Sequence, residues 1–158
     1  MLKTDLPTRR SILALLAAGL VLPSRSLRAE APTVHVHKDP DCGCCGGWVD
    51  HLRSAGFAVT VDETSDLSTI RTRLRVPPTL WSCHTAEVSG YAIEGHVPAD
   101  AIRRLLETRP TALGLAVPGM PAGSPGMEGG NPVAYDVILF AASGQSPFMR
   151  FVGTKSVG

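Results

Sequence analysis

The stretch VHVHKDPDCGCCGGWVDHL, residues 34–52, decides how the rest of the chain is interpreted. At its start Val34 and Val36 alternate with two histidines, which is typical of a half-buried β-strand. At its end Trp48 and Leu52 recur at the spacing of one face of an α-helix. The three cysteines are therefore expected where a strand passes into the N-terminus of a helix.

Outside this stretch the same two periodicities predict further strands and helices. They are a strand at 57–63, a short helix capped by Ser65, a third strand approached through 76–83, a turn at 85–87, a fourth strand at 88–94 and a helix beginning at Pro98. The resulting β-α-β-α-β-β-α order is a parallel β-α-β unit followed by an antiparallel hairpin and a closing helix. It is typical of a thioredoxin-like α/β fold. Such folds place a cis-proline opposite their cysteines, and Pro78 is the candidate for it.

Residues 111–158 are expected to extend this domain. The segment 114–132, GLAVPGMPAGSPGMEGGNP, is rich in glycine and proline, which predicts a loop. Loops longer than about 12–15 residues are uncommon in compact domains and are often functional. The spaced methionines Met120 and Met127 favour a functional loop here. Strands at 134–141 and 147–152, joined around Ser143-Gly144, are expected to form a C-terminal β-hairpin.

The length of the chain, 158 residues, is that of one domain. We therefore expect a single thioredoxin-like metal-binding domain at 32–158, with the extension included. Fifteen basic against fourteen acidic residues leave a formal net charge of +1. Binding of nucleic acid calls for a strongly basic face, so this balance argues against nucleic acid as a partner.

Residues 1–31 have the pattern of an export signal. The paired Arg9 and Arg10 precede an apolar run at 12–22, which is too short for a transmembrane helix of about 20 residues. Small residues at 29–31 provide a cleavage site, and the two arginines favour the twin-arginine export route. An uncleaved signal anchor is the alternative. In either case the domain lies outside the cytoplasm, and we expect the periplasm, with no membrane insertion once the signal is cleaved.

Four cysteines in an oxidising compartment leave several interpretations open. Two structural disulfides are the common arrangement there, but adjacent Cys44 and Cys45 fit it badly, because a disulfide needs converging Cβ vectors. A redox dithiol formed by Cys42 and Cys45, in C-x-x-C spacing, is a second interpretation. The amides and the dipole at a helix N-terminus would lower the pKa of such a thiol. The third interpretation is a metal site to which Cys83 adds a fourth thiolate.

Three or four convergent thiolates suit a soft ion, and Cu(I), Zn(II) and iron–sulfur clusters are the candidates. The thioethers of Met120 and Met127 suit Cu(I) and not Zn(II). Structural zinc sites more usually contain two separated cysteine or cysteine–histidine pairs, and no iron–sulfur spacing is recognisable. His96, in EGHVP, is a further candidate ligand near Cys83. For the other histidines we expect a turn for His84, a helix face for His51 and a solvated strand face for His35 and His37.

These motifs resemble the CopG-like family of periplasmic copper-binding proteins, long described as a domain of unknown function with a suggested metal-binding role. The resemblance rests on CGCCGGWVDHL (42–52), SCHTAEVSGYAIEGHVP (82–98) and GLAVPGMPAGSPGM (114–127). It implies a thioredoxin-like domain with a C-terminal extension, a cysteine cluster that binds several copper ions, and a thiol-linked copper oxidoreductase role in copper resistance. It implies copper ligation by Cys42, Cys44, Cys45 and Cys83, and more loosely by His96, Met120 and Met127. The histidine-bearing strand VHVHK has no assigned place in that pattern.

The sequence therefore predicts a periplasmic Cu(I)-binding protein that buffers copper or changes its oxidation state, with redox chemistry at Cys42 and Cys45. Its expected partners are copper ions and other periplasmic copper-handling proteins. The alternative is a thiol–disulfide oxidoreductase that acts on exported proteins and binds copper only adventitiously. Cys44 argues against that alternative, because a third thiol between the pair invites mixed disulfides. A purely structural exported domain is the third hypothesis.

Overall fold

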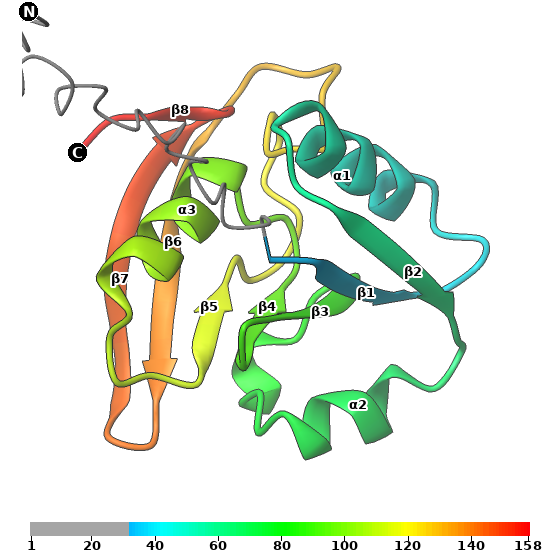
Figure 1. Cartoon of the computed structure of the whole chain (residues 1–158). Coiled ribbons are helices and arrows are strands. Elements are labelled where there is room, and N and C mark those ends of the chain that lie inside the picture. Colours follow the sequence, from blue (N-terminus) through cyan, green and yellow to red (C-terminus); the bar gives the residue numbers. More distant parts are fainter. Residues whose placement is uncertain (1–31) are drawn as a thin grey trace, which may run out of the picture. The chain divides into compact units, whose positions relative to one another are not determined.

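A computed structural model describes residues 32–158 of the chain. The twin-arginine export signal expected at 1–31 lies outside the described residues. Within 32–158, three α-helices and an eight-stranded sheet make a mixed α/β fold (Figure 1). None of the helices in this part of the chain has both the length and the apolar character that crossing a membrane requires.

The helices are α1 (Gly43–Ser54), α2 (Leu67–Arg73) and α3 (Ala99–Thr108), with a short 3-10 helix, η1 (Pro78–Leu80). The strands are β1 (Val34–Lys38), β2 (Val59–Glu63), β3 (His84–Val88), β4 (Tyr91–Glu94), β5 (Gly114–Ala116), β6 (Ala134–Ala141), β7 (Gly144–Val152) and β8 (Lys155–Ser156). They form one sheet in the order β2-β1-β3-β4-β5-β6-β7-β8. The pairs β1/β2 and β4/β5 are parallel, and the other neighbouring pairs are antiparallel.

The predicted order of elements is confirmed from β1 to α3. In β1 the side chains of Val34 and Val36 are completely buried, and the two histidines of the strand therefore point to the opposite face of the sheet. In α1 the buried face contains Trp48, Val49 and Leu52. Burial of each such large apolar side chain contributes roughly 1.5–3 kcal/mol. The hydrophobic pattern thus sets both the strand and the helix that flank the cysteines.

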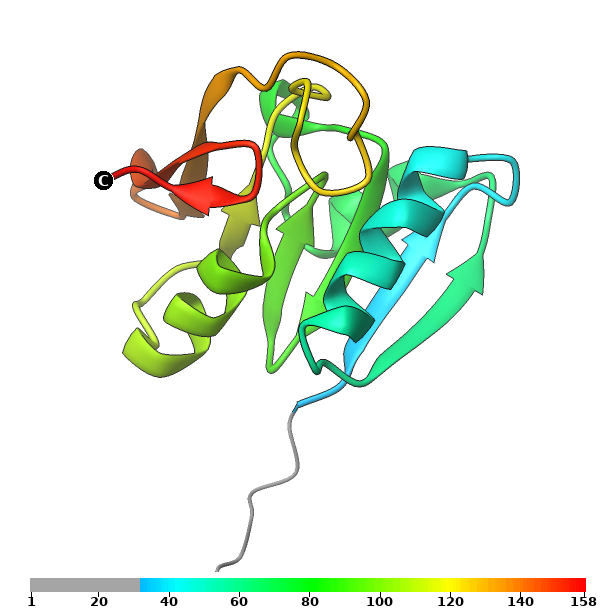
Figure 2. The same ribbon diagram turned by 90° about the horizontal axis from the view of Figure 1, so that it is seen from above.

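Helices cover both faces of the sheet. α1 and α3 lie on one face (Figure 2), where their apolar side chains form a single core cluster with β1, β3 and β4. α2 lies on the other face (Figure 1), and a smaller apolar cluster between η1, β4, β5 and β6 fills part of that side. This layering leaves the N-terminus of α1 at the edge of the sheet where β1 ends.

The hairpin of β3 and β4 turns at Ser89-Gly90, and the turn expected at 85–87 is wrong. Ser89 and Gly90 have φ angles of 48° and 86°, and a two-residue hairpin turn of this kind requires a positive φ at both central positions. Residues 85–87 lie inside β3 instead. The third strand begins at His84, so Cys83 lies directly before it.

The expectation of a cis bond at Pro78 is also wrong, because no peptide bond within residues 32–158 is cis. Pro78 instead begins η1, and its fixed φ suits the first position of a helix. The cap expected at Ser65 lies one residue later. The Asp66 carboxylate accepts a hydrogen bond from the Thr69 amide at 3.2 Å, and hydrogen bonds from Ser68 and Thr69 lower the pKa of Asp66 to about 2.

The extension contains one strand that the loop prediction for 114–132 did not include. β5 has only three residues, and it pairs with β4 on one side and β6 on the other. The remainder of that segment is a loop, as expected. The C-terminal hairpin is confirmed as β6 and β7, with Ala141 opposite Gly144.

Candidate metal centre

The first three cysteines lie at the N-terminus of α1. Cys42 occupies the N-cap position, and its side chain makes no capping hydrogen bond. Cys42 and Cys45 are joined by a disulfide, with their Cα atoms 5.4 Å apart. Cys44 and Cys83 are free thiols. The C-x-x-C pair predicted as redox-active is therefore oxidised, and the third cysteine stays outside the bond.

Cys83 reaches this helix end because the backbone amide and carbonyl of the preceding residue, Ser82, are both held by buried side chains. The Ser82 amide donates to the Glu94 carboxylate at 2.7 Å, and the Ser82 carbonyl accepts from the Arg71 guanidinium at 2.5 Å. Arg71 and Glu94 also pair with each other at 3.0 Å. Glu94 is fully buried, and its second oxygen accepts from the Thr85 hydroxyl at 2.6 Å. This buried network fixes the chain one residue before Cys83.

The four sulfur atoms converge, as the sequence predicted. The Sγ atoms of Cys42 and Cys44 are 3.5 Å apart, and those of Cys44 and Cys83 are 3.8 Å apart. All four Sγ atoms lie within 4.8 Å of one another. Cys45 is buried while the other three are partly exposed. A small ion can therefore approach the cluster from solvent.

The environment keeps the Cys83 sulfur protonated when the cluster is empty. Burial raises the pKa of the Cys83 thiol to about 11, and the neighbouring Cys44 sulfur adds to the rise. Thiolate is the form that binds metal, so a bound cation must displace this proton. Binding of a cation to Cys83 would therefore release a proton.

Two buried histidines lie behind the cluster. His84, directly after Cys83, packs against the Trp48 ring at 4.3 Å and against the His96 ring at 5.1 Å between ring centroids. His96 Nδ1 donates to the Pro125 carbonyl at 2.8 Å, while His96 Nε2 and both ring nitrogens of His84 have no hydrogen-bond partner. Burial lowers the pKa of His84 to about 3 and also lowers that of His96. Both rings are therefore neutral and have lone pairs available at neutral pH.

The loop between β5 and β6 packs against both cysteine-bearing segments. Ser82 Oγ donates to the Gly119 carbonyl at 2.6 Å. At Gly126 the backbone comes so close to α1 that a Cβ atom there would collide with the Cys44 carbonyl and lie 2.7 Å from the Trp48 amide nitrogen. Figure 2 shows the loop beside the first turn of α1. The Gly/Pro/Met-rich segment thus covers one side of the cysteine cluster.

The predicted ligands fall into three groups. The four cysteines are brought together. His96 is buried nearby, but it lies outside the set of mutually close metal-binding atoms. Met120 is 54 % exposed and Met127 is half-buried in the covering loop; both stay predictions as ligands.

Sequence reasoning missed two features of this site. His84 was expected in a turn, yet it is the first residue of β3 and completely buried. The Arg71–Glu94 pair was not anticipated at all. One sequence signal for this pair was available: Glu94 ends a short, otherwise apolar strand, YAIE, and a glutamate buried there requires a partner.

Comparison with known proteins places these features in a family. A family described as "Protein of unknown function, DUF411" matches residues 80–127, and no curated protein matches the chain. The solved structure titled "Copper resistance protein copG- Form 1" is 45% identical, with a TM-score of 0.73, over 78% of this chain and 100% of that chain. For "Copper resistance protein copG- Form 2" the values are 44%, 0.70, 82% and 100%. The chain therefore belongs to the family of the copper resistance protein CopG.

Proposed function

We propose that this protein handles copper as its cargo and substrate, holding Cu(I) between the sulfur atoms of Cys42, Cys44, Cys45 and Cys83. The observation that carries the proposal is the convergence of four sulfurs, from two distant segments, to within 4.8 Å of one another. Structures of relatives titled copper resistance proteins share 44–45% of their residues with this chain, which supports copper as the ion.

The donor set favours copper over other soft ions. Thiolates bind Cu(I), Zn(II) and iron–sulfur clusters, and only Cu(I) among these also accepts neutral thioethers readily. Met120 and Met127 belong to the loop that packs against the cluster. His96 Nε2 is a buried lone pair without a partner, and such a group is costly unless something binds it. We infer that His96 and the two methionines complete the copper environment.

The redox step that we propose uses the Cys42–Cys45 pair. Two Cu(II) ions each accept one electron, and the thiolates of Cys42 and Cys45 together lose two electrons and form one S–S bond. In the reverse direction the disulfide takes one electron from each of two Cu(I) ions and yields two thiolates. Cys44 and Cys83 keep their thiol groups in both directions, so they can hold copper while the pair changes oxidation state.

We further infer a thioredoxin-like arrangement for the part of the domain from β1 to α3. Parallel β1/β2, antiparallel β3 and β4, and helices on both faces support this assignment. With an export signal at 1–31, the protein would act in the periplasm in copper resistance, and would exchange copper with other periplasmic copper-handling proteins.

The experiment that tests the proposal is an anaerobic competition titration with a Cu(I) chelator. The chain is reduced, and the variants Cys44→Ser and Cys83→Ser are compared singly with the unaltered protein. Each substitution is expected to lower both the affinity and the number of tightly bound Cu(I) ions. Ser146→Ala, at an exposed position of β7 and without a sulfur, is the control and is expected to keep the number of ions. Unchanged tight binding in both cysteine variants would show that the thiolate cluster is not the site.

A thiol–disulfide oxidoreductase acting on exported proteins is the second candidate, and the oxidised Cys42–Cys45 pair at a helix N-terminus favours it. The two functions predict different results for Cys44→Ser. A protein oxidoreductase keeps or gains disulfide-exchange activity, because the intervening thiol no longer competes for mixed disulfides. A copper protein loses metal. Rates of reduction of a disulfide-bonded test protein, measured beside copper affinity, separate them.

A further inference from the structure

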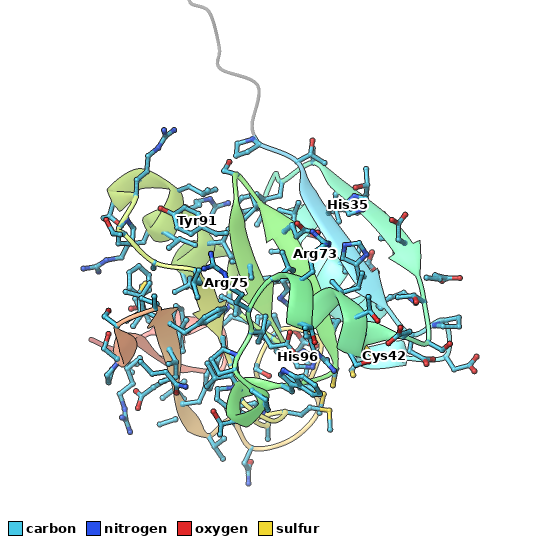
Figure 3. The ribbon with its side chains drawn as sticks, turned by 90° about the horizontal axis from the view of Figure 1, so that it is seen from below. His35, Cys42, Arg73, Arg75, Tyr91 and His96 are labelled. Carbon is cyan, nitrogen blue, oxygen red and sulfur yellow. A yellow bond between two sulfur atoms is a disulfide. The ribbon has the colours of Figure 1, made fainter. Side chains whose placement is uncertain are left out.

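A second group of metal-binding side chains lies on the sheet face that carries α2. His35 and His37 of β1 point away from the buried valines of that strand. Asp62 of β2 lies beside them, because β1 and β2 are parallel with His37 opposite Asp62. One ligand atom from each of these three residues lies within 4.8 Å of the others. Figure 3 shows the molecule from below, with His35 and Arg73 of α2 labelled.

The hydrogen bonds of His37 leave one particular nitrogen free. His37 Nε2 lies 3.2 Å from Glu87 Oε1, and since a carboxylate only accepts, Nε2 carries a proton and donates it. The remaining atom, Nδ1, faces Asp62 Oδ2 at 4.0 Å. Arg73 in turn holds Glu87 through two bonds of 2.6 and 3.1 Å. The Glu87 carboxylate thus holds the His37 ring through Nε2–H, as a carboxylate commonly does for a histidine whose other nitrogen binds a metal.

His35 is oriented in the same manner. Its Nδ1 lies 2.7 Å from the Thr60 hydroxyl, and its Nε2 lies 2.9 Å from Asp62 Oδ2. Because a carboxylate only accepts, Nε2 carries the proton and donates it to Asp62. The Thr60 hydroxyl accepts as readily as it donates, so the ring can instead carry its proton on Nδ1, bond Thr60 there and offer the Nε2 lone pair to a cation. One oxygen of Asp62 therefore lies between His37 Nδ1 and His35 Nε2, the two nitrogens that would bind an ion once His35 carries its proton on Nδ1.

The spacing suits a small divalent cation. Ligand bonds of about 2.0–2.2 Å in tetrahedral geometry separate neighbouring ligand atoms by about 3.4 Å, and the observed separations from Asp62 are 2.9 and 4.0 Å. The Asp62 and His35 side chains are 61% and 42% exposed, whereas His37 is 9% exposed. His37 and Asp62 also line a surface hollow of about 680 Å³. A fourth ligand position would therefore be open to water.

We propose that His35, His37 and Asp62 form a second metal site, which binds a borderline divalent cation, with Cu(II) preferred and Zn(II) next. Imidazole and carboxylate donors select such ions, and the general order of divalent affinities places Cu(II) first. This donor set contains no sulfur, so it complements the soft cysteine cluster. The chain would then hold reduced copper at the helix N-terminus and oxidised copper on the sheet.

The test uses the full chain carrying Cys44→Ser and Cys83→Ser, with the Cys42–Cys45 disulfide kept oxidised, so that no free thiol competes. All five histidines lie within the described residues, and two of them, His84 and His96, are fully buried. Cu(II) chloride is titrated while electron paramagnetic resonance and nitrogen spin-echo modulation count the coupled imidazoles. We expect one tightly bound ion with two imidazole nitrogens. Zn(II) should compete for it.

Four further substitutions and one control in this background test whether these residues bind the ion. His35→Gln and His37→Gln should each remove one coupled imidazole and weaken binding by more than tenfold. Asp62→Asn, at an exposed position, leaves the fold intact and should also weaken binding. Glu87→Gln should weaken it roughly 10–100-fold through the orientation of His37. His51→Gln is the matched control, a half-buried histidine on α1, and should change nothing.

The proposal is overturned if His35→Gln and His37→Gln keep the affinity and both nitrogen couplings, or if Asp62→Asn binds like its parent. If only His51→Gln lost the nitrogen couplings of bound Cu(II), the ion would be bound at α1, and this result would also overturn the proposal. Because the cluster thiols are absent from this background, these results are independent of the proposed Cu(I) site.

Discussion

Gly126 controls the contact between the covering loop and α1. Its φ is 84°, and an added Cβ would meet the Cys44 carbonyl and the Trp48 amide. Gly129 of the same loop has a φ of 117° and nothing within 4 Å of a built Cβ. Gly126→Ala and Gly129→Ala therefore both place an alanine at a positive φ, at a cost of roughly 1–2 kcal/mol, and Gly126→Ala adds the clash.

We expect Gly126→Ala to lower the free energy of unfolding by about 1–3 kcal/mol more than Gly129→Ala, the usual cost of overpacking. Urea unfolding of both variants measures the difference. Equal losses would mean that the loop does not rest on the helix.

His84 gives the copper-free protein a pH-dependent stability. Burial lowers its pKa in the fold to about 3, from 6.5 in the unfolded chain, so between these values the unfolded chain binds more protons. Stability is therefore fully present above pH 6.5 and falls as the pH decreases, by up to about 1.4 kcal/mol for each pH unit. His96, whose pKa burial also lowers, acts in the same direction.

Substitution of His84 by Leu should flatten the profile of unfolding free energy between pH 6.5 and 4. Denaturant titrations at several pH values test this. An unchanged slope in His84→Leu would contradict the assignment of the effect to this ring.

At the scale of elements, α2 is tied to the sheet by Arg71. The buried Glu94 carboxylate has no other cationic partner in the contacts of the described chain, and burial raises its pKa although Thr85, Ser82 and Arg71 oppose the rise. Removing one member of a buried ion pair costs about 3–5 kcal/mol, because the remaining charge is left uncompensated. Arg73, two residues along α2, pairs with Glu87 at a surface position.

Arg71→Met should therefore destabilise the protein by about 3–5 kcal/mol, and Arg73→Met by less than about 1 kcal/mol. Thermal and urea unfolding measure both. If the two methionine variants lost the same stability, the anchoring role given to Arg71 would be wrong.

Much of the element order was predictable because local periodicity is strong in β1, α1 and α3. The errors occurred where long-range pairing decides the conformation. β5 has three residues and exists because β4 and β6 flank it. The turn at Ser89-Gly90 does have a local signal, the Ser-Gly dipeptide. Pro78 begins a 3-10 helix of three residues, which is too short to show a hydrophobic periodicity in the sequence.

At the scale of the whole molecule, the cysteine site is assembled from three distant segments: the start of α1, the residues before β3, and the loop after β5. The spacing of Cys42, Cys44 and Cys45 predicted the first segment, and Cys83 converges with it, as expected. The burial of His84 was not predictable in this way. For Glu94 the apolar strand indicated that a buried partner is needed, but not that Arg71 is this partner. Both depend on which faces of the sheet the helices cover.

The central claim is that sulfur from both cysteine-bearing segments surrounds the copper. X-ray absorption at the copper K edge of the Cu(I)-loaded protein tests it directly, with Cys83→Ser as the comparison. We predict a first coordination shell dominated by sulfur, with fewer sulfur neighbours per copper in Cys83→Ser. A shell of nitrogen and oxygen only, or the same sulfur count in both proteins, would contradict the account.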